Sequence, residues 1–286
     1  MERLRRTWEL AKSSWRVLQH DRELLALPIL SFVVSLLVLV PMVLLAVAVG
    51  DLSSVTSSSS TQTEASVDPA IVVIMIIASL AITVVSVFFN GALVAGAHER
   101  FTGGDPTVGS ALRRAIGRLP ALVAWALITG TVGLILRAVQ ERLGWLGRFV
   151  VGLIGAAWEI ATFLVVPAVV IDHTGAVDGL KRSAGMLKQT WGENIAARIG
   201  FGLLGFVLVI PGLIVGGAAV AVGGAIAIVG IALAVAWIAL VVVVMTALSA
   251  IFQTALYMYA SSGTVPSGFG ADLTAAFGPP TGSRAF

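Results

Sequence analysis

Residues 195–259 restrict the possible fold more than any other stretch, because they contain a single charged residue, Arg198. A water-exposed surface cannot be covered by so few polar groups, whereas a lipid bilayer needs none. The rest of the chain is similar: 58% of its 286 residues are hydrophobic and 12% are charged, against about 25% charged in soluble domains. We therefore expect an all-α, polytopic membrane helical bundle.

Six apolar runs are long enough to be transmembrane spans. Four lie at about 24–50, 70–97, 120–139 and 149–171, and 195–259 holds two more. One helix over 195–259 would be about 97 Å long at ~1.5 Å per residue, far more than a ~30 Å hydrocarbon core. The glycine-rich segment 216–224 is therefore the predicted turn. We interpret residues 1–286 as one membrane domain, with the six-span bundle at 24–259.

Basic segments with one apolar face precede each pair of spans. They lie at 1–23, 107–118 and 176–191, where apolar residues recur at steps of three and four opposite Lys and Arg. Such helices suit the membrane interface; packing on the protein's own loops is the alternative. The sequence thus predicts three hairpins, each preceded by a cytoplasmic amphipathic helix, and a Gly/Pro-rich cytoplasmic tail at 260–286. These units also indicate an internal repeat.

The distribution of Lys and Arg predicts the orientation. With the N-terminus inside, 15 of the 18 basic residues fall in inner segments, and only Arg137, Arg142 and Arg148 fall outside. Cytoplasmic loops of membrane proteins carry such an excess. We expect a multi-pass protein of the plasma membrane with both termini in the cytoplasm.

Three polar side chains within the spans are candidates for function. Glu159 lies near the middle of span four, and an ionisable residue at that depth is a functional hypothesis by default. It could carry a proton, bind a cation or pair with Arg137; a protonated packing residue is the alternative. Asn90 in span two and Gln253 in span six are expected to form hydrogen bonds between helices.

The inner basic residues predict the partner. Anionic lipids attract Lys and Arg beside a membrane, so we expect contacts with the cytoplasmic leaflet and none with nucleic acid. A second copy of the chain is a possible partner. The expected lipid-headgroup contacts are Arg113, Arg114, Arg118, Lys181, Arg182 and Lys188.

Side chains that support catalysis or cofactor binding are sparse. The chain has no cysteine, and none of its three histidines stands at a recognised nucleophile spacing. The pairs His98-Glu99 and Asp172-His173 offer metal-ligand types at the inner ends of even spans, but without the spacing of a known metal motif. We therefore expect no enzyme activity, no cofactor and no metal site.

Five stretches carry a resemblance to a known family. They are LAKSSWRVLQHDRELLALP at 10–28, HERFTGGDPTVGSALRRA at 98–115, WALITGTVGLILRAVQER at 125–142, GAAWEIATFLVVPAVVIDHTGAVDGLKRSAGMLKQTWGEN at 155–194 and IFQTALYMYASSGTVPSGF at 251–269. Together they resemble a family of prokaryotic six-span membrane proteins known only as a domain of unknown function. The resemblance implies the fold and an integral membrane location, and no activity.

These observations lead to two functional hypotheses. The first is a non-enzymatic, membrane-organising or lipid-associated scaffold, based on the basic amphipathic segments. The alternative is a transporter or channel for a small solute or lipid that uses Glu159.

Overall fold

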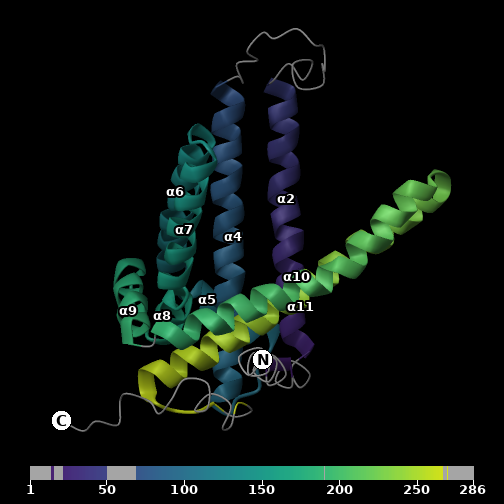
Figure 1. The fold of residues 1–286 in the computed structure, drawn as a ribbon. Coiled ribbons are helices and arrows are strands. Elements are labelled where there is room, and N and C mark those ends of the chain that lie inside the picture. The colour runs from purple at the N-terminus through teal and green to yellow at the C-terminus, as the bar shows by residue number, and fades with distance from the viewer. Residues whose placement is uncertain (1–13, 16–21, 50–68, 190, 267–268, 270–286) are drawn as a thin grey trace.

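The computed structural model describes residues 14–15, 22–49, 69–189, 191–266 and 269, and every regular element among them is helical (Figure 1). The predicted N-terminal helix at 1–23 and the tail at 260–286 lie largely outside these residues. The elements are η1 (Arg22–Leu25), α2 (Ala26–Val49), α4 (Pro69–Phe101), α5 (Val108–Ile116), α6 (Leu119–Arg142), α7 (Trp145–Ala161), α8 (Val165–Ile171), α9 (Ala176–Gln189), α10 (Trp191–Val222) and α11 (Gly224–Ser262).

Six segments of the described chain are long and apolar enough to cross a membrane, which confirms the all-α fold with six candidate spans. Gly223 and Gly224 form the turn between the last two, with φ of 78° and 61°. This is the C-terminal end of the predicted turn at 216–224, and glycine adopts such φ values without strain. The spans are Glu23–Val49, Pro69–Phe101, Leu119–Arg142, Trp145–Ile171, Gly205–Val222 and Ala227–Ser262.

Helix α4 is the centre of the fold, since it contacts α2, α5, α6, α8 and α11. Most of its buried residues lie in its C-terminal part, from Phe89 to Phe101. There it packs against Leu24 and Leu27 and against the C-terminal half of α11. The N-terminal part of α4 and nearly all of α2 expose large aliphatic side chains. Such surfaces are stable against hydrocarbon and unfavourable against water.

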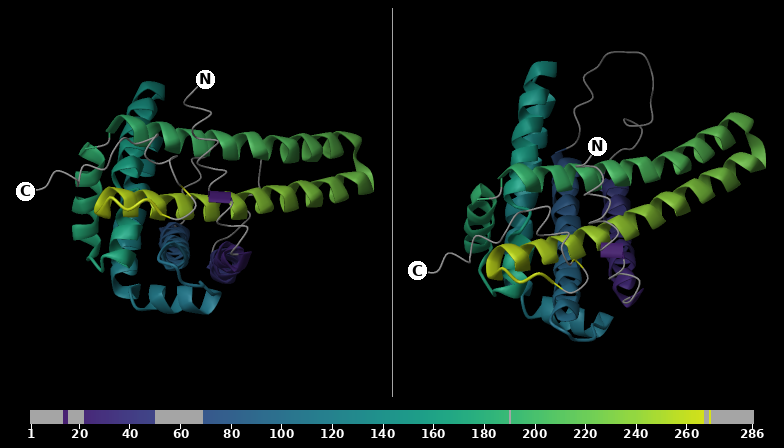
Figure 2. Two further views of the ribbon diagram at one scale, coloured as in Figure 1. Left: turned by 90° about the horizontal axis from the view of Figure 1, so that it is seen from below. Right: turned by 60° about the horizontal axis from the view of Figure 1, so that its bottom comes forward.

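The hairpin of α10 and α11 does not run parallel to the other spans. It crosses the C-terminal half of α4 and the N-terminal half of α2 obliquely, and its turn projects beyond α2 (Figures 1 and 2). The segment Ala227–Ser262 has 36 residues, or about 54 Å at ~1.5 Å per residue. A helix of that length fits a ~30 Å hydrocarbon core only if it tilts or protrudes. The excess length of α11 is therefore consistent with the oblique packing of the hairpin.

Helices α5 and α9 bury only part of the faces that the sequence predicts to be apolar. Helix α5 covers α4 with Ala111 and Ala115, while Ile116 is 58% exposed. Helix α9 packs on α8, α7 and α6, and Val177 on its first turn is 55% exposed. Small residues face the neighbouring helix in both cases, Ala111 and Ala115 on α5 and Gly179 on α9. Such residues allow the backbones to approach closely.

Candidate functional site

The fourth span is interrupted between α7 and α8, at residues 162–164, and its free backbone groups are bonded by side chains from other helices. The Ser183 hydroxyl of α9 donates to the Ala161 carbonyl at 2.7 Å and accepts from the Leu164 N–H at 3.1 Å. The Gln253 side-chain amide of α11 donates to the Phe163 carbonyl. Backbone groups within a bilayer need such partners, because lipid offers none.

Pro167 explains the interruption. A proline lacks the N–H that would bond to the carbonyl four residues earlier, and its ring collides with that carbonyl. The carbonyl in question is that of Phe163, the group that Gln253 bonds. Pro167 instead occupies the first turn of the new helix α8, where no intrahelical N–H bond is required.

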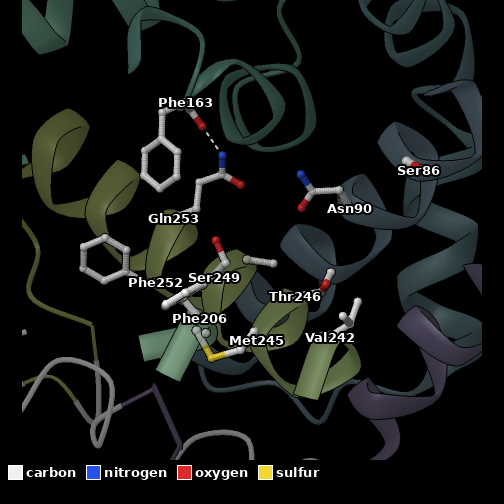
Figure 3. A pocket seen from close by; sticks show the side chains of 12 residues that line it. Ser86, Asn90, Phe163, Phe206, Val242, Met245, Thr246, Ser249, Phe252 and Gln253 are labelled. Carbon is white, nitrogen blue, oxygen red and sulfur yellow. Dashed lines mark hydrogen bonds between the residues drawn. The ribbon is translucent and has the colours of Figure 1, made fainter. Parts of the chain in front are cut away.

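A cavity of about 620 Å³ lies beside this break (Figure 3). Asn90 of α4 and Gln253 of α11 reach into it from opposite sides, and their amides point toward one another in Figure 3. Ser249 and Thr246 of α11 add hydroxyl groups, while the remaining wall is mostly apolar. The structure thus brings together two of the three candidate residues from the spans, although the two amides are not hydrogen-bonded to each other.

Glu159 lies elsewhere. It is on α7 before the break, its side chain is exposed, and it does not line the cavity. Exposure on a candidate span places a carboxyl group toward the surroundings of the protein rather than toward an internal path. This geometry gives no support to the transport role considered for Glu159.

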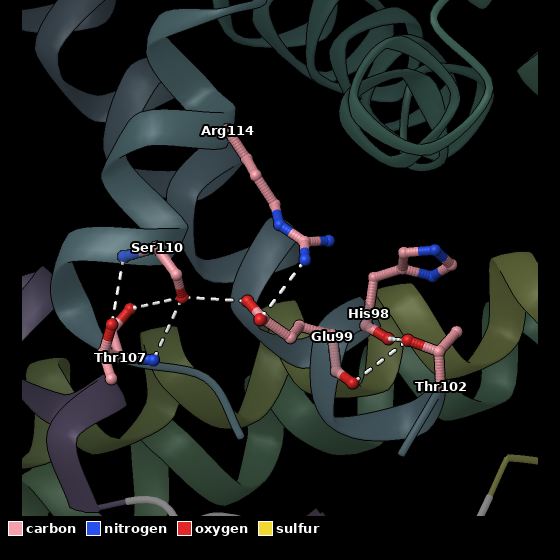
Figure 4. Close-up of polar contacts among 6 residues, drawn as sticks. All are labelled: His98, Glu99, Thr102, Thr107, Ser110 and Arg114. Atoms are coloured by element: carbon pink, nitrogen blue, oxygen red, sulfur yellow. Dashed lines mark hydrogen bonds and ion pairs between the residues drawn. The ribbon is translucent and has the colours of Figure 1, made fainter. Parts of the chain in front are cut away.

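A polar cluster fixes the corner between α4 and α5 (Figure 4). Thr107 caps α5 by accepting from the Ser110 N–H, and the Ser110 hydroxyl accepts from the Thr107 N–H, which is a capping-box arrangement. The Ser110 hydroxyl also donates to Glu99 at 2.8 Å, and Glu99 pairs with Arg114 at 3.2 Å. Arg114 therefore already has a carboxylate partner within the chain.

A second cluster joins α8, α9 and α11. The Asp172 carboxylate pairs with Arg182 at 2.6 Å and accepts a hydrogen bond from the Tyr257 hydroxyl at 2.5 Å. Tyr257 is fully buried, so the bond satisfies a hydroxyl that would otherwise lie in an apolar core. Arg182 is thus also neutralised by a carboxylate of the chain.

The other predicted lipid contacts differ from Arg114 and Arg182, which each pair with a partly buried carboxylate. Arg113 is exposed and Arg118 partly exposed, and neither pairs with a carboxylate among the described residues. Lys181 is exposed, with Asp178 at 3.6 Å as its neighbour in α9. Lys188 lies within α9, but its side chain is outside the described part.

The pairs His98-Glu99 and Asp172-His173 supply the metal-ligand types noted in the sequence. Within the described ranges, no group of three or more His, Asp or Glu side chains is close enough to hold a metal ion. The Asp172 carboxylate forms an ion pair with Arg182, and the Glu99 carboxylate forms one with Arg114.

The comparisons with known proteins identify a family. A family of unknown function, DUF6159, matches residues 67–269, which is more than half of the chain. The chain belongs to this family. No curated protein and no solved structure matches it. The DUF6159 match covers the break, the cavity and both polar clusters, and it assigns no activity to them.

Several residues that shape this part of the DUF6159 region were not predicted as site residues. They include Ser183, Tyr257 and Ser249. Pro167 was the available signal, because a proline inside an apolar span implies an unpaired carbonyl four residues earlier. Gln253, which bonds this carbonyl, lies 90 positions farther along the chain. This contact therefore depends on tertiary packing.

Proposed function

We propose that the protein is a non-enzymatic, multi-pass protein of the plasma membrane that binds anionic lipid headgroups and thereby organises the surrounding cytoplasmic leaflet. The supporting observation is a group of basic side chains on the segments after α4 and α8 that have no buried carboxylate partner in the described part of the chain: Arg113, Arg118 and Lys181. Each such group near an anionic surface contributes about 1 kcal/mol. Arg114 and Arg182 hold the helices in place through Glu99 and Asp172.

Three basic residues at the other ends of the spans provide a matched control for this proposal. Arg137, Arg142 and Arg148 are exposed on α6 and α7. Neutralising them removes the same number of charges as neutralising Arg113, Arg118 and Lys181. Any difference between the two triple variants then reports position rather than net charge.

The test uses the full chain in nanodiscs that contain a zwitterionic lipid and a trace of fluorescent anionic lipid. We expect the unmodified protein to enrich the anionic lipid around itself, and the variant with Arg113, Arg118 and Lys181 changed to Gln to lose that enrichment by roughly ten- to a hundredfold. The control triple variant should retain it, and salt should weaken it. Equal enrichment by both variants would refute the proposal.

Transport of a small solute or lipid remains the second candidate function. Its support comes from the cavity at the break in the fourth span, and not from Glu159, which lies outside the cavity.

A further inference from the structure

We propose that the cavity between α4, α10 and α11 is a binding site for an uncharged lipid of the diacylglycerol type. This site is separate from the basic residues that carry the proposed function, and its chemistry is different. The proposal depends on the polar groups inside the cavity, on the absence of charge there and on the way the cavity opens.

Three polar side chains of the cavity make no hydrogen bond to another residue that the structure describes, and a fourth is bonded only in part. Asn90 makes no hydrogen bond to another described residue, and neither do the hydroxyls of Thr246 and Ser249. Thr254, one turn farther along α11, bonds its own helix at the Ala250 carbonyl. Gln253 uses its N–H group on Phe163 and leaves its oxygen toward the cavity (Figure 3). An amide without a partner in an apolar span is costly, so these groups favour a ligand with hydroxyl and carbonyl groups.

Among the described residues, none that lines the cavity is ionisable. A charged headgroup placed there would lose its hydration without gaining a countercharge, which is strongly unfavourable. The polar part of the ligand is therefore uncharged. The amide of Asn90 can donate and accept, the oxygen of Gln253 can accept, and the hydroxyls can do both. Ester carbonyls and a free hydroxyl, as in a diacylglycerol, match this set.

The cavity opens on an apolar surface. At its rim, Phe206 and Val242 are 64% and 55% exposed. Gln253 and Phe252 are buried, with only 7% and 2% of their surface exposed. The volume of about 620 Å³ lies within the ~300–1,000 Å³ of small-molecule sites. The glycerol and ester groups would lie beside Asn90 and Gln253, and the acyl chains would pass over the rim onto the exposed aliphatic side chains of α10 and α11.

The test measures photo-crosslinking of the full chain in nanodiscs with a diacylglycerol that carries a photoactivatable diazirine. We expect crosslinks on peptides containing residues 86–90 or 242–253, and competition by unlabelled diacylglycerol. Phosphatidic acid with the same acyl chains, which adds only the charged phosphate, should compete at least about tenfold more weakly. Crosslinks spread over all lipid-exposed helices, or equal competition by the two lipids, would overturn the proposal.

Asn90→Leu is the decisive variant, because Asn90 has no hydrogen bond within the described chain whose loss would disturb the fold. It should keep the thermal stability of the unmodified protein and weaken diacylglycerol binding about five- to tenfold, the loss of roughly one hydrogen bond. Ser249→Ala should weaken binding less. Thr131→Val, on the exposed face of α6 away from the cavity, should change nothing. Unaltered binding in both Asn90→Leu and Ser249→Ala would disprove the site.

Discussion

At the scale of single residues, Ser183 is the side chain whose loss is expected to matter most. It is fully buried and bonds both a carbonyl and an N–H at the break in the fourth span. Ser183→Ala leaves two backbone groups without partners, so we expect the free energy of unfolding to fall by about 1–3 kcal/mol. Unfolding in mixed detergent micelles measures this. Ser261→Ala, which removes an exposed hydroxyl from the end of α11, is the control and should have almost no effect.

The three polar residues within the spans show how much of the site could be predicted from the sequence. Asn90, Gln253 and Glu159 were all recognisable as polar residues in apolar spans, since position along a run fixes approximate depth. Which of them meet depends on how the helices cross: Asn90 and Gln253 line one cavity, and Glu159 faces outward. A pattern along one helix carries no information about the rotation of another.

At the scale of secondary-structure elements, the packing of α9 on α8 depends on Gly179. A Cβ atom built there would lie 3.2 Å from Val169 and 3.4 Å from Val165, so a larger side chain forces the helices apart. We expect Gly179→Leu to lower the free energy of unfolding by about 1–3 kcal/mol, the usual effect of overpacking. Thermal denaturation followed by size-exclusion chromatography in detergent measures it.

The matched control for this prediction is Gly185→Leu on the same helix. A Cβ atom there meets nothing within 4 Å, and leucine favours helix relative to glycine by about 0.8–1 kcal/mol. Gly185→Leu should therefore leave stability unchanged or raise it slightly. If both variants were equally destabilised, α9 would not be packed on α8 through Gly179.

The helices could be predicted from the sequence where the length and composition of an apolar run are enough to identify a span. Apolar runs longer than a bilayer requires predicted the first four candidate spans to within a few residues and two more within 195–259, and glycines marked the turn between these two. The break at 162–164 and the oblique path of α10 and α11 were not predicted. Both depend on contacts between distant segments, such as those of Ser183 and Gln253 with the break.

At the scale of the whole molecule, the remaining prediction is its orientation in the membrane. The excess of basic residues in the segments after α4 and α8 predicts that these lie in the cytoplasm. The connection between α6 and α7 and the turn between α10 and α11 then lie outside. In Figure 1 that turn rises in the direction of the C-terminal end of α2, which is compatible with a tilted hairpin that still crosses the bilayer.

The chain contains no cysteine, so single cysteines can report the side of each segment without background. Gly144 and Val222 are exposed at the two proposed outer turns, and Gly109 and Lys181 are exposed on α5 and α9. We expect an impermeant thiol reagent to label Gly144→Cys and Val222→Cys on intact cells, and the other two only after permeabilisation. Labelling of Gly109→Cys or Lys181→Cys on intact cells would reverse the orientation. If Val222→Cys reacted only after permeabilisation, or not at all, α10 and α11 would not cross the membrane, because a turn held at the inner face or inside the hydrocarbon cannot meet a water-soluble reagent from outside.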